Sequence, residues 1–142
     1  MEHSRDCGFL IKQIADNIAK TANLALKSQD ITISQLRFLE LLYTKGREVP
    51  LKEAEAYFDV AQATIAGITS RLVKKGLIVL SPSPENHRAK LAALTEQGRL
   101  VYEAAMQSRD MTEQRILAPL SEAEAAEFAL LLRKVSDGVK KT

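Results

Sequence analysis

The sequence predicts a mainly α-helical fold with one small β-hairpin. Apolar residues recur at spacings of three and four along most of the 142 residues, which is typical of amphipathic helices. Two short apolar segments, residues 77–80 and 90–94, enclose a stretch rich in proline and serine, which favours a hairpin over a further helix. The predicted order is four helices, the hairpin, a long helix and a last helix.

The composition is that of a folded domain, with 46% hydrophobic and 27% charged residues. No run of about 18 apolar residues occurs, and the first residues lack the pattern of a signal peptide. We therefore expect a cytoplasmic protein with no membrane segment. A single cysteine, Cys7, excludes an internal disulfide, and with two histidines it offers no ligand set for a metal. No glycine-rich phosphate loop or acid pair indicates an enzyme, and we expect no cofactor.

Local signals place the first three helices. Residues 6–27 have the apolar spacing of a long helix. Residues 32–35, Thr-Ile-Ser-Gln, form a capping box that opens a second helix, which is expected to end near Gly46. Pro50 stands where a first-turn proline is tolerated, and we expect it to open a short helix through Tyr57.

The helix expected over residues 61–75 has an unusual outer face. Ile65, Ile68 and Leu72 form its apolar stripe. The other side is small and hydroxylated near its start and basic near its end: Gln62, Ala63, Thr64, Ala66, Gly67, Ser70, Arg71 and Lys74. Small side chains let a bulky partner approach closely, and the polar ones can hydrogen-bond to it. The alternative is an idle surface without a partner.

Long helices complete the chain. Thr95 is expected to cap a helix through Ile116, and residues 120–124 contain a second capping box. The first and last helices carry more apolar surface than a winged domain of about 65 residues could bury, so we expect pairing with the same helices of a second subunit. The predicted dimer-interface residues are Ile11, Ile14, Ile18, Phe128, Leu131, Leu132 and Val135.

Two short helices, a small-faced helix and a hairpin together match a winged helix-turn-helix domain, here flanked by N- and C-terminal dimerisation helices. The predicted boundaries are residues 1–30 for the N-terminal dimerisation helix, 31–95 for the DNA-binding domain and 96–142 for the C-terminal dimerisation helices. In this design the small-faced helix reads the major groove of double-stranded DNA and the hairpin tip, or wing, reaches the minor groove. The charge agrees, because residues 61–100 have a balance of +4 within a chain of net charge +2.

Four segments in this order also resemble the MarR (multiple antibiotic resistance) family of transcriptional regulators: residues 31–39, 62–78, 82–90 and 94–98. The resemblance implies a homodimer that binds a palindromic operator, most often as a repressor. It also implies that small aromatic or phenolic ligands weaken DNA binding from a crevice between the dimer helices and the reading domain.

The resemblance also assigns roles to single residues. By position, the residues at or near the major groove would be Gln62, Thr64, Ala66, Gly67 and Arg71. Arg88 would be the minor-groove arginine of the wing. The predicted DNA-binding set also contains Ala63, Ser70 and Lys74 of the outer helix face and Asn86, His87 and Lys90 of the wing.

Two positions depart from the family pattern. Asn86 stands where the family usually has an Asp that pairs with the wing arginine, and Leu80 stands where an Arg is common. Both changes predict a less basic and more flexible wing. We therefore expect weaker or more salt-sensitive DNA binding than the family norm.

Two other functions remain open at this point. A winged-helix protein with weakened DNA reading would act as a protein-binding adaptor or antirepressor, which the missing wing charges favour. One branch of the family senses peroxide through a thiol placed much like Cys7, near the start of the first helix. In that case Tyr43, Tyr57 or Tyr102 would have to approach the thiol.

Overall fold

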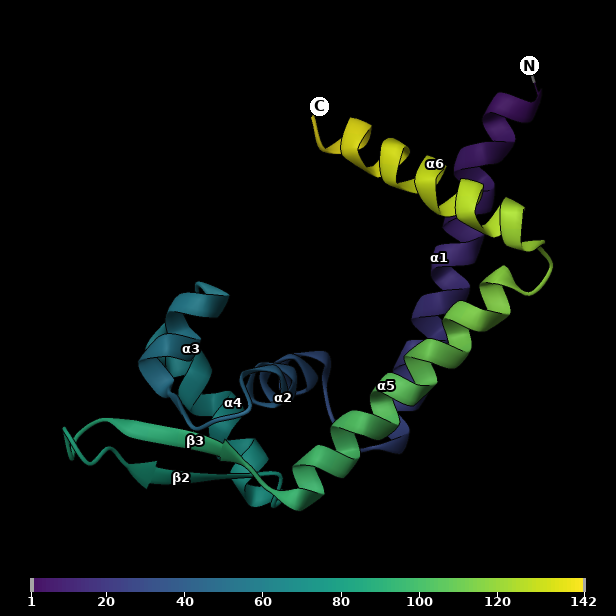
Figure 1. Cartoon of the computed structure of the whole chain (residues 1–142). Coiled ribbons are helices and arrows are strands. Elements are labelled where there is room, and N and C mark those ends of the chain that lie inside the picture. Colours follow the sequence, from purple (N-terminus) through teal and green to yellow (C-terminus); the bar gives the residue numbers. More distant parts are fainter. Residues whose placement is uncertain (1, 142) are drawn as a thin grey trace. The chain divides into compact units, whose positions relative to one another are not determined.

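The computed structural model describes residues 2–141, and their side chains from residue 6 onwards. The chain divides into two compact units, residues up to 108 and residues from 109 onwards, which are described separately. The elements, labelled in Figure 1, are α1 (Glu2–Ser28), α2 (Ile33–Lys45), β1 (Val49–Pro50), α3 (Leu51–Phe58), α4 (Gln62–Lys74), β2 (Ile78–Pro82), β3 (Lys90–Leu94), α5 (Glu96–Leu117) and α6 (Glu122–Lys140). The mainly helical fold with a small sheet is as predicted, and the helix bounds agree to within a few residues.

The core of the first unit lies where α2, α3 and α4 meet the sheet. Phe38, Leu39, Ile65, Leu72 and Ile78 are each at most 1% exposed. They occupy the apolar positions of α2, α4 and β2, and full burial of such a side chain stabilises the fold by about 1.5–3 kcal/mol. Because this stripe faces the core, the opposite side of α4 faces solvent.

The wing belongs to a three-stranded antiparallel sheet of order β1-β3-β2. β2 and β3 pair along their full lengths and form the long hairpin in Figure 1. β1 pairs with the other edge of β3, with Val49 opposite Ala92. The sequence predicted only the two strands of the hairpin and missed β1, because β1 is very short and its partner is distant in sequence.

Pro50 has a different place from the predicted one. Its φ of −59° and ψ of 140° are extended rather than helical, and it is both the last residue of β1 and the N-cap of α3. The prediction that it lies in the first helical turn is wrong by one residue. Pairing with Leu91 in the sheet keeps its ψ extended, so the helix begins at Leu51.

Side-chain caps fix the helix ends where the sequence predicts them. Thr32 Oγ1 accepts from Gln35 N at 3.2 Å, and Gln35 Oε1 accepts from Thr32 N at 3.3 Å. Ser121 and Glu124 form the same reciprocal pair at the start of α6, at 3.1 and 2.9 Å. Gly46 ends α2 with a left-handed φ of 65°, which glycine adopts without strain.

The junction between the sheet and α5 is closely packed. Thr95 Oγ1 accepts a hydrogen bond from Gly98 N at 3.0 Å and donates one to Gly76 O at 2.7 Å. A Cβ atom at Gly98 would lie 2.1 Å from the carbonyl oxygen of Leu77. Only glycine therefore allows α5 to start this close to the chain that enters β2.

The second unit contains the end of α5 and the whole of α6. No side chain of α6 is buried. Within residues 2–141, no helix combines the length and the apolar character needed to cross a lipid bilayer.

Candidate nucleic-acid interface

Helix α4 turns its small and polar face outward. Of the predicted contact residues on this helix, Gly67 is half-buried and the others are exposed: Gln62, Ala63, Thr64, Ala66, Ser70, Arg71 and Lys74. A Cβ atom at Gly67 would meet only Arg71 Nη1, at 3.8 Å. The fold itself therefore has room for a side chain at Gly67, and a requirement for glycine there would come from a partner.

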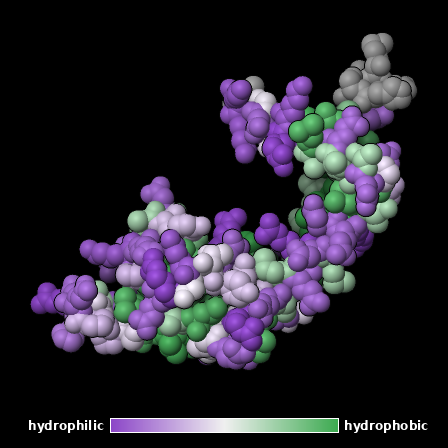
Figure 2. Space-filling model, in the orientation of Figure 1, coloured by the Kyte–Doolittle hydropathy of each residue, from purple (hydrophilic) through white to green (hydrophobic). Residues whose placement is uncertain are grey.

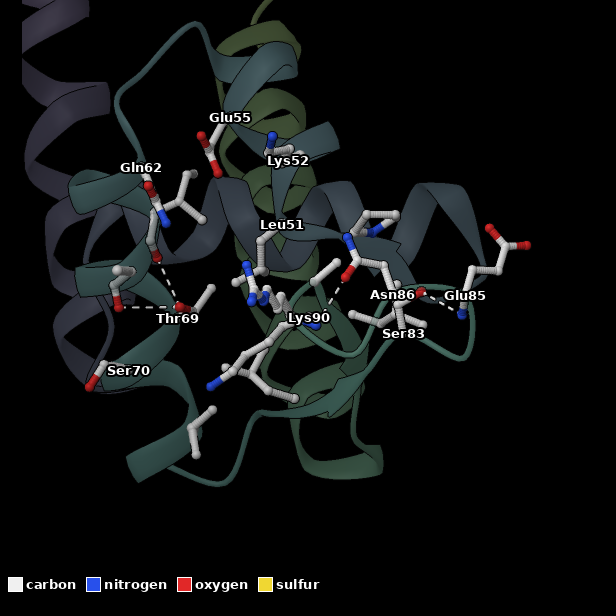
Figure 3. A pocket seen from close by; sticks show the side chains of 18 of the residues that line it. Leu51, Lys52, Glu55, Gln62, Thr69, Ser70, Ser83, Glu85, Asn86 and Lys90 are labelled. Atoms are coloured by element: carbon white, nitrogen blue, oxygen red, sulfur yellow. Dashed lines mark hydrogen bonds between the residues drawn. The ribbon is translucent and has the colours of Figure 1, made fainter.

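A groove of about 1040 Å³ lies between α3, α4 and the wing (Figure 3). In Figure 3, Lys52 and Glu55 come from α3, Gln62 and Ser70 from α4, and Asn86 from the wing. The groove brings together these predicted contact residues: Gln62, Ala66, Ser70, Lys74, Asn86, Arg88 and Lys90. The remaining predicted contact residues lie outside its lining: Ala63, Thr64, Gly67, Arg71 and His87.

Local hydrogen bonds shape the wing tip. Asn86 Oδ1 accepts from Arg88 N at 3.2 Å, and the Asn86 carbonyl accepts from Ala89 N at 2.9 Å. Ser83 N donates to Ala89 O at 2.8 Å, and Ser83 Oγ accepts from Glu85 N at 3.3 Å. Asn86 thus organises the turn through the backbone and not through the Arg88 guanidinium.

The cations around the groove are not neutralised by the side chains that the structure describes. Lys52, Lys74, Arg88 and Lys90 form no ion pair with any of the side chains that the structure describes, those of residues 6–141. Hydrophilic residues cover the wing tip, at the left of Figure 2. Unpaired lysines and arginines on such a surface can replace the counterions of a polyanion.

The structure adds groove residues that sequence reasoning did not single out, among them the exposed or half-buried polar residues Lys52, Glu55, Ser83 and Glu85. Two of them are carboxylates, which reduce the positive charge of the groove. Only Lys52 carries a local signal, because a lysine in the first turn of a helix opposes the helix dipole. Glu55 joins the site through the packing of α3 against α4, which no local pattern indicates.

The predicted dimer residues are apolar side chains at helix surfaces. On α1, Ile11, Ile14 and Ile18 are 37–50% exposed. On α6, Phe128 is half-buried, whereas Leu131, Leu132 and Val135 are 43–52% exposed. Amphipathic helices in proteins gain most of their stability by burying the apolar face, so each of these faces needs a partner surface.

A polar cluster connects α2 with α5. Tyr43 OH donates to Glu103 Oε2 at 3.1 Å, and Arg99 binds the carboxylates of Glu103 and Glu96. The Tyr43 ring also packs on Tyr102, with ring centroids 4.5 Å apart. The hydrogen bond to Glu103 raises the pKa of Tyr43, and the bond from Arg99 lowers the pKa of Glu96.

The remaining candidate groups are the thiol of Cys7 and the side chains that can bind a metal. Cys7 is exposed, with a free thiol. Among the residues that the structure describes, no three His, Cys, Asp or Glu side chains are grouped to hold a metal ion.

Comparison with known proteins agrees with this geometry. The MarR family model matches residues 29–89, which include α2, α4 and most of the wing. The chain is 29% identical over 119 residues to the transcriptional repressor NicR of Pseudomonas putida, covering 82% of this chain and 75% of NicR. It is 24% identical over 111 residues to the transcriptional activatory protein BadR of Rhodopseudomonas palustris, covering 77% of this chain and 63% of BadR.

Solved structures share the fold. The YusO protein of Bacillus subtilis superposes with a TM-score of 0.89 at 21% identity, covering 96% of both chains. The MepR–DNA complex of S. aureus superposes with a TM-score of 0.82 at 24% identity, covering 93% of this chain and 98% of MepR. The fold, the matched segment and the curated relatives, which are transcriptional regulators, agree: residues 29–89 match the MarR family model, and the chain has the winged-helix fold of these solved structures.

Proposed function

We propose that the chain is a transcriptional regulator that binds a palindromic DNA operator as a homodimer. The observation that carries the proposal is the groove in which the small, polar face of α4 meets the unpaired cations of the wing. Major-groove reading needs a helix that can approach base edges closely, and affinity needs cations for the phosphates. One domain, residues 31–95, would supply both the reading helix and the cations.

The residues divide by the chemistry that they offer. Gln62 and Thr64, at the exposed start of α4, can hydrogen-bond to bases or adjoining phosphates. Arg71 and Lys74 reach the backbone or a guanine edge, and Arg88 enters the minor groove, where the negative potential attracts a guanidinium. Ala63 and Ser70 of α4 and His87 and Lys90 of the wing would make further contacts with the duplex.

The exposed apolar faces of α1 and α6 support a homodimer. Burial of one exposed aliphatic side chain contributes up to about 1.5–3 kcal/mol, and each helix offers three or more. Pairing places two copies of α4 about 34 Å apart, on successive major grooves of one face of the duplex.

We further propose that the regulator acts in the cytoplasm as a repressor and that a small aromatic or phenolic ligand releases it. The name of NicR supports repression, whereas BadR is named as an activator, so the direction of control needs its own reporter assay. No catalytic step is part of this proposal.

The test is a selection of binding sites from a random duplex pool. The selected duplex and a scrambled control are then titrated at two salt concentrations. A palindromic site bound at least about a thousandfold more tightly than the control would support the proposal. Equal, weak and steeply salt-dependent binding to both duplexes would contradict it, because only phosphate contacts would then remain.

The second candidate function is a protein-binding adaptor or antirepressor. Glu55 and Glu85 favour it, because both carboxylates line the groove and would repel phosphate. Loss of specific DNA binding in Arg88→Ala would argue against this candidate. Specific DNA binding that is unchanged in Arg88→Ala would favour the adaptor function.

A peroxide-sensing role for Cys7 is a minor third candidate. Its thiol is exposed and free, as an oxidisable thiol must be. If Cys7→Ser leaves peroxide-dependent release from DNA unchanged, the thiol is not the sensor.

A further inference from the structure

Helix α4 ends in two adjacent lysines with different surroundings. Lys74 lines the groove and makes no ion pair with any described residue. Lys75 Nζ instead donates to the Asp30 carbonyl and to Gln35 Oε1, the latter at 2.9 Å. One lysine is therefore free for a partner, and the other is engaged within the fold.

Both acceptors of Lys75 belong to the junction between α1 and α2. Asp30 has a left-handed φ of 55°, which is uncommon for a residue other than glycine. The Gln35 side chain is 4% exposed, and its Oε1 also accepts from Thr32 N in the capping box that opens α2. Lys75 thus contacts the two groups that shape this turn.

The charge of Lys75 suits this position. Lys75 is the C-cap of α4, and its backbone N–H donates to the Arg71 carbonyl. Asp30 lies just beyond the end of α1, where its N–H donates to the Lys27 carbonyl at 3.0 Å. The ammonium group therefore lies near the negative end of the α1 dipole, which attracts a cation, while the first turn of α2, to which Gln35 belongs, opposes it.

We propose that Lys75 is a positioning residue that fixes the recognition helix α4 relative to α1. The inference rests on the proposed function, in which α1 pairs the subunits and α4 reads the operator. In such a dimer, the distance between the two copies of α4 depends on how each is held relative to α1. Lys75 thus sets which half-site spacing the dimer accepts, without contacting DNA.

Lys75→Met tests the proposal, with Lys74→Met as the matched control. Each variant is titrated against the selected operator and against an operator with one added base pair between the half-sites, at several salt concentrations. Lys74→Met should weaken binding to all duplexes and reduce the slope of log affinity against log salt by about 0.9. Lys75→Met should leave that slope unchanged and lower both the affinity for the selected operator and the spacing preference about tenfold.

Two results would overturn the positioning role. A reduced slope of log affinity against log salt in Lys75→Met would show that this lysine contacts phosphate. An unchanged spacing preference would show that it does not position α4. Lys75→Arg, which keeps two donors and the charge, should restore the preference.

Hydrogen exchange of the DNA-free protein separates this inference from the proposed function. The Ile31 amide donates to the Leu26 carbonyl at 3.1 Å within the turn that Lys75 contacts. Lys75→Met should raise its exchange rate about tenfold, and Lys74→Met should leave it unchanged. Equal rates in all proteins would overturn the contact, whatever the DNA experiments show. Failure of the unmodified protein to select any operator would instead contradict the proposed function.

Discussion

Gly67→Ala separates what the fold requires at the centre of α4 from what DNA requires. The added Cβ would meet only Arg71 Nη1, at 3.8 Å, an ordinary van der Waals distance. Replacing a glycine inside a helix by alanine favours folding by about 1 kcal/mol, which corresponds to a rise in Tm of about 3 °C for a chain of this size. If α4 lies in the major groove, the same methyl group must enter a packed interface. Such overpacking costs about 1–3 kcal/mol, or roughly a 5- to 150-fold loss of operator affinity.

The assay combines a thermal melt with titration of the selected operator and a scrambled duplex. Gly8→Ala is the matched control, because its Cβ would have no neighbour within 4 Å and it lies in α1, outside the groove. This control should keep operator affinity within about twofold. Unchanged operator affinity in Gly67→Ala, together with a raised Tm, would refute close approach of α4 to DNA. A lowered Tm in Gly67→Ala would contradict the inference that the fold does not require glycine at this position.

Three further predictions follow from single contacts. Gly98→Ala should lower the free energy of unfolding by about 1–3 kcal/mol, because the added Cβ would lie 2.1 Å from the Leu77 carbonyl oxygen. A denaturant titration measures this change, and unchanged stability would contradict the close packing of the junction. Arg71→Ala should cost about 1–3 kcal/mol of binding on the operator and less on a scrambled duplex, and an equal loss on both would exclude base reading. The Tyr43 pKa is raised above 10.0 by Glu103, so its contribution to stability is complete below that pH and is lost as the pH rises through the folded-state pKa. Ultraviolet titration should give a lower pKa for this phenol in Glu103→Gln, and an unchanged value would show that Glu103 is not the cause.

The sequence predicted those parts of the fold that depend on local signals. The capping boxes at Thr32 and Ser121 and the cap at Thr95 use only neighbouring residues, and the structure confirms each. The apolar stripe of α4 likewise predicted which face is exposed. Parts that depend on distant pairing were missed, since β1 exists only through contact with β3, and that contact keeps Pro50 extended.

The candidate site divides in the same way. The face of α4 and the wing could be predicted from helical spacing and from a turn-rich loop. Glu55 could not, because only the packing of α3 against α4 brings it to the groove. Lys74 and Lys75 look alike in the sequence, and only the tertiary contact with Asp30 and Gln35 distinguishes them.

Directed cleavage of the selected operator tests the central claim, that α4 reads the major groove while the wing reaches the minor groove. In a Cys7→Ser background, a single cysteine replaces Ala61 at the start of α4 or Glu85 on the wing, both of which are exposed and outside the predicted contact set, and carries an iron chelate that produces hydroxyl radicals. Ala61→Cys should cleave within each half-site, with the two cleavage centres about 34–36 Å apart, and Glu85→Cys should cleave in the flanking minor grooves. Uniform cleavage along the duplex, or one pattern from both positions, would contradict the account.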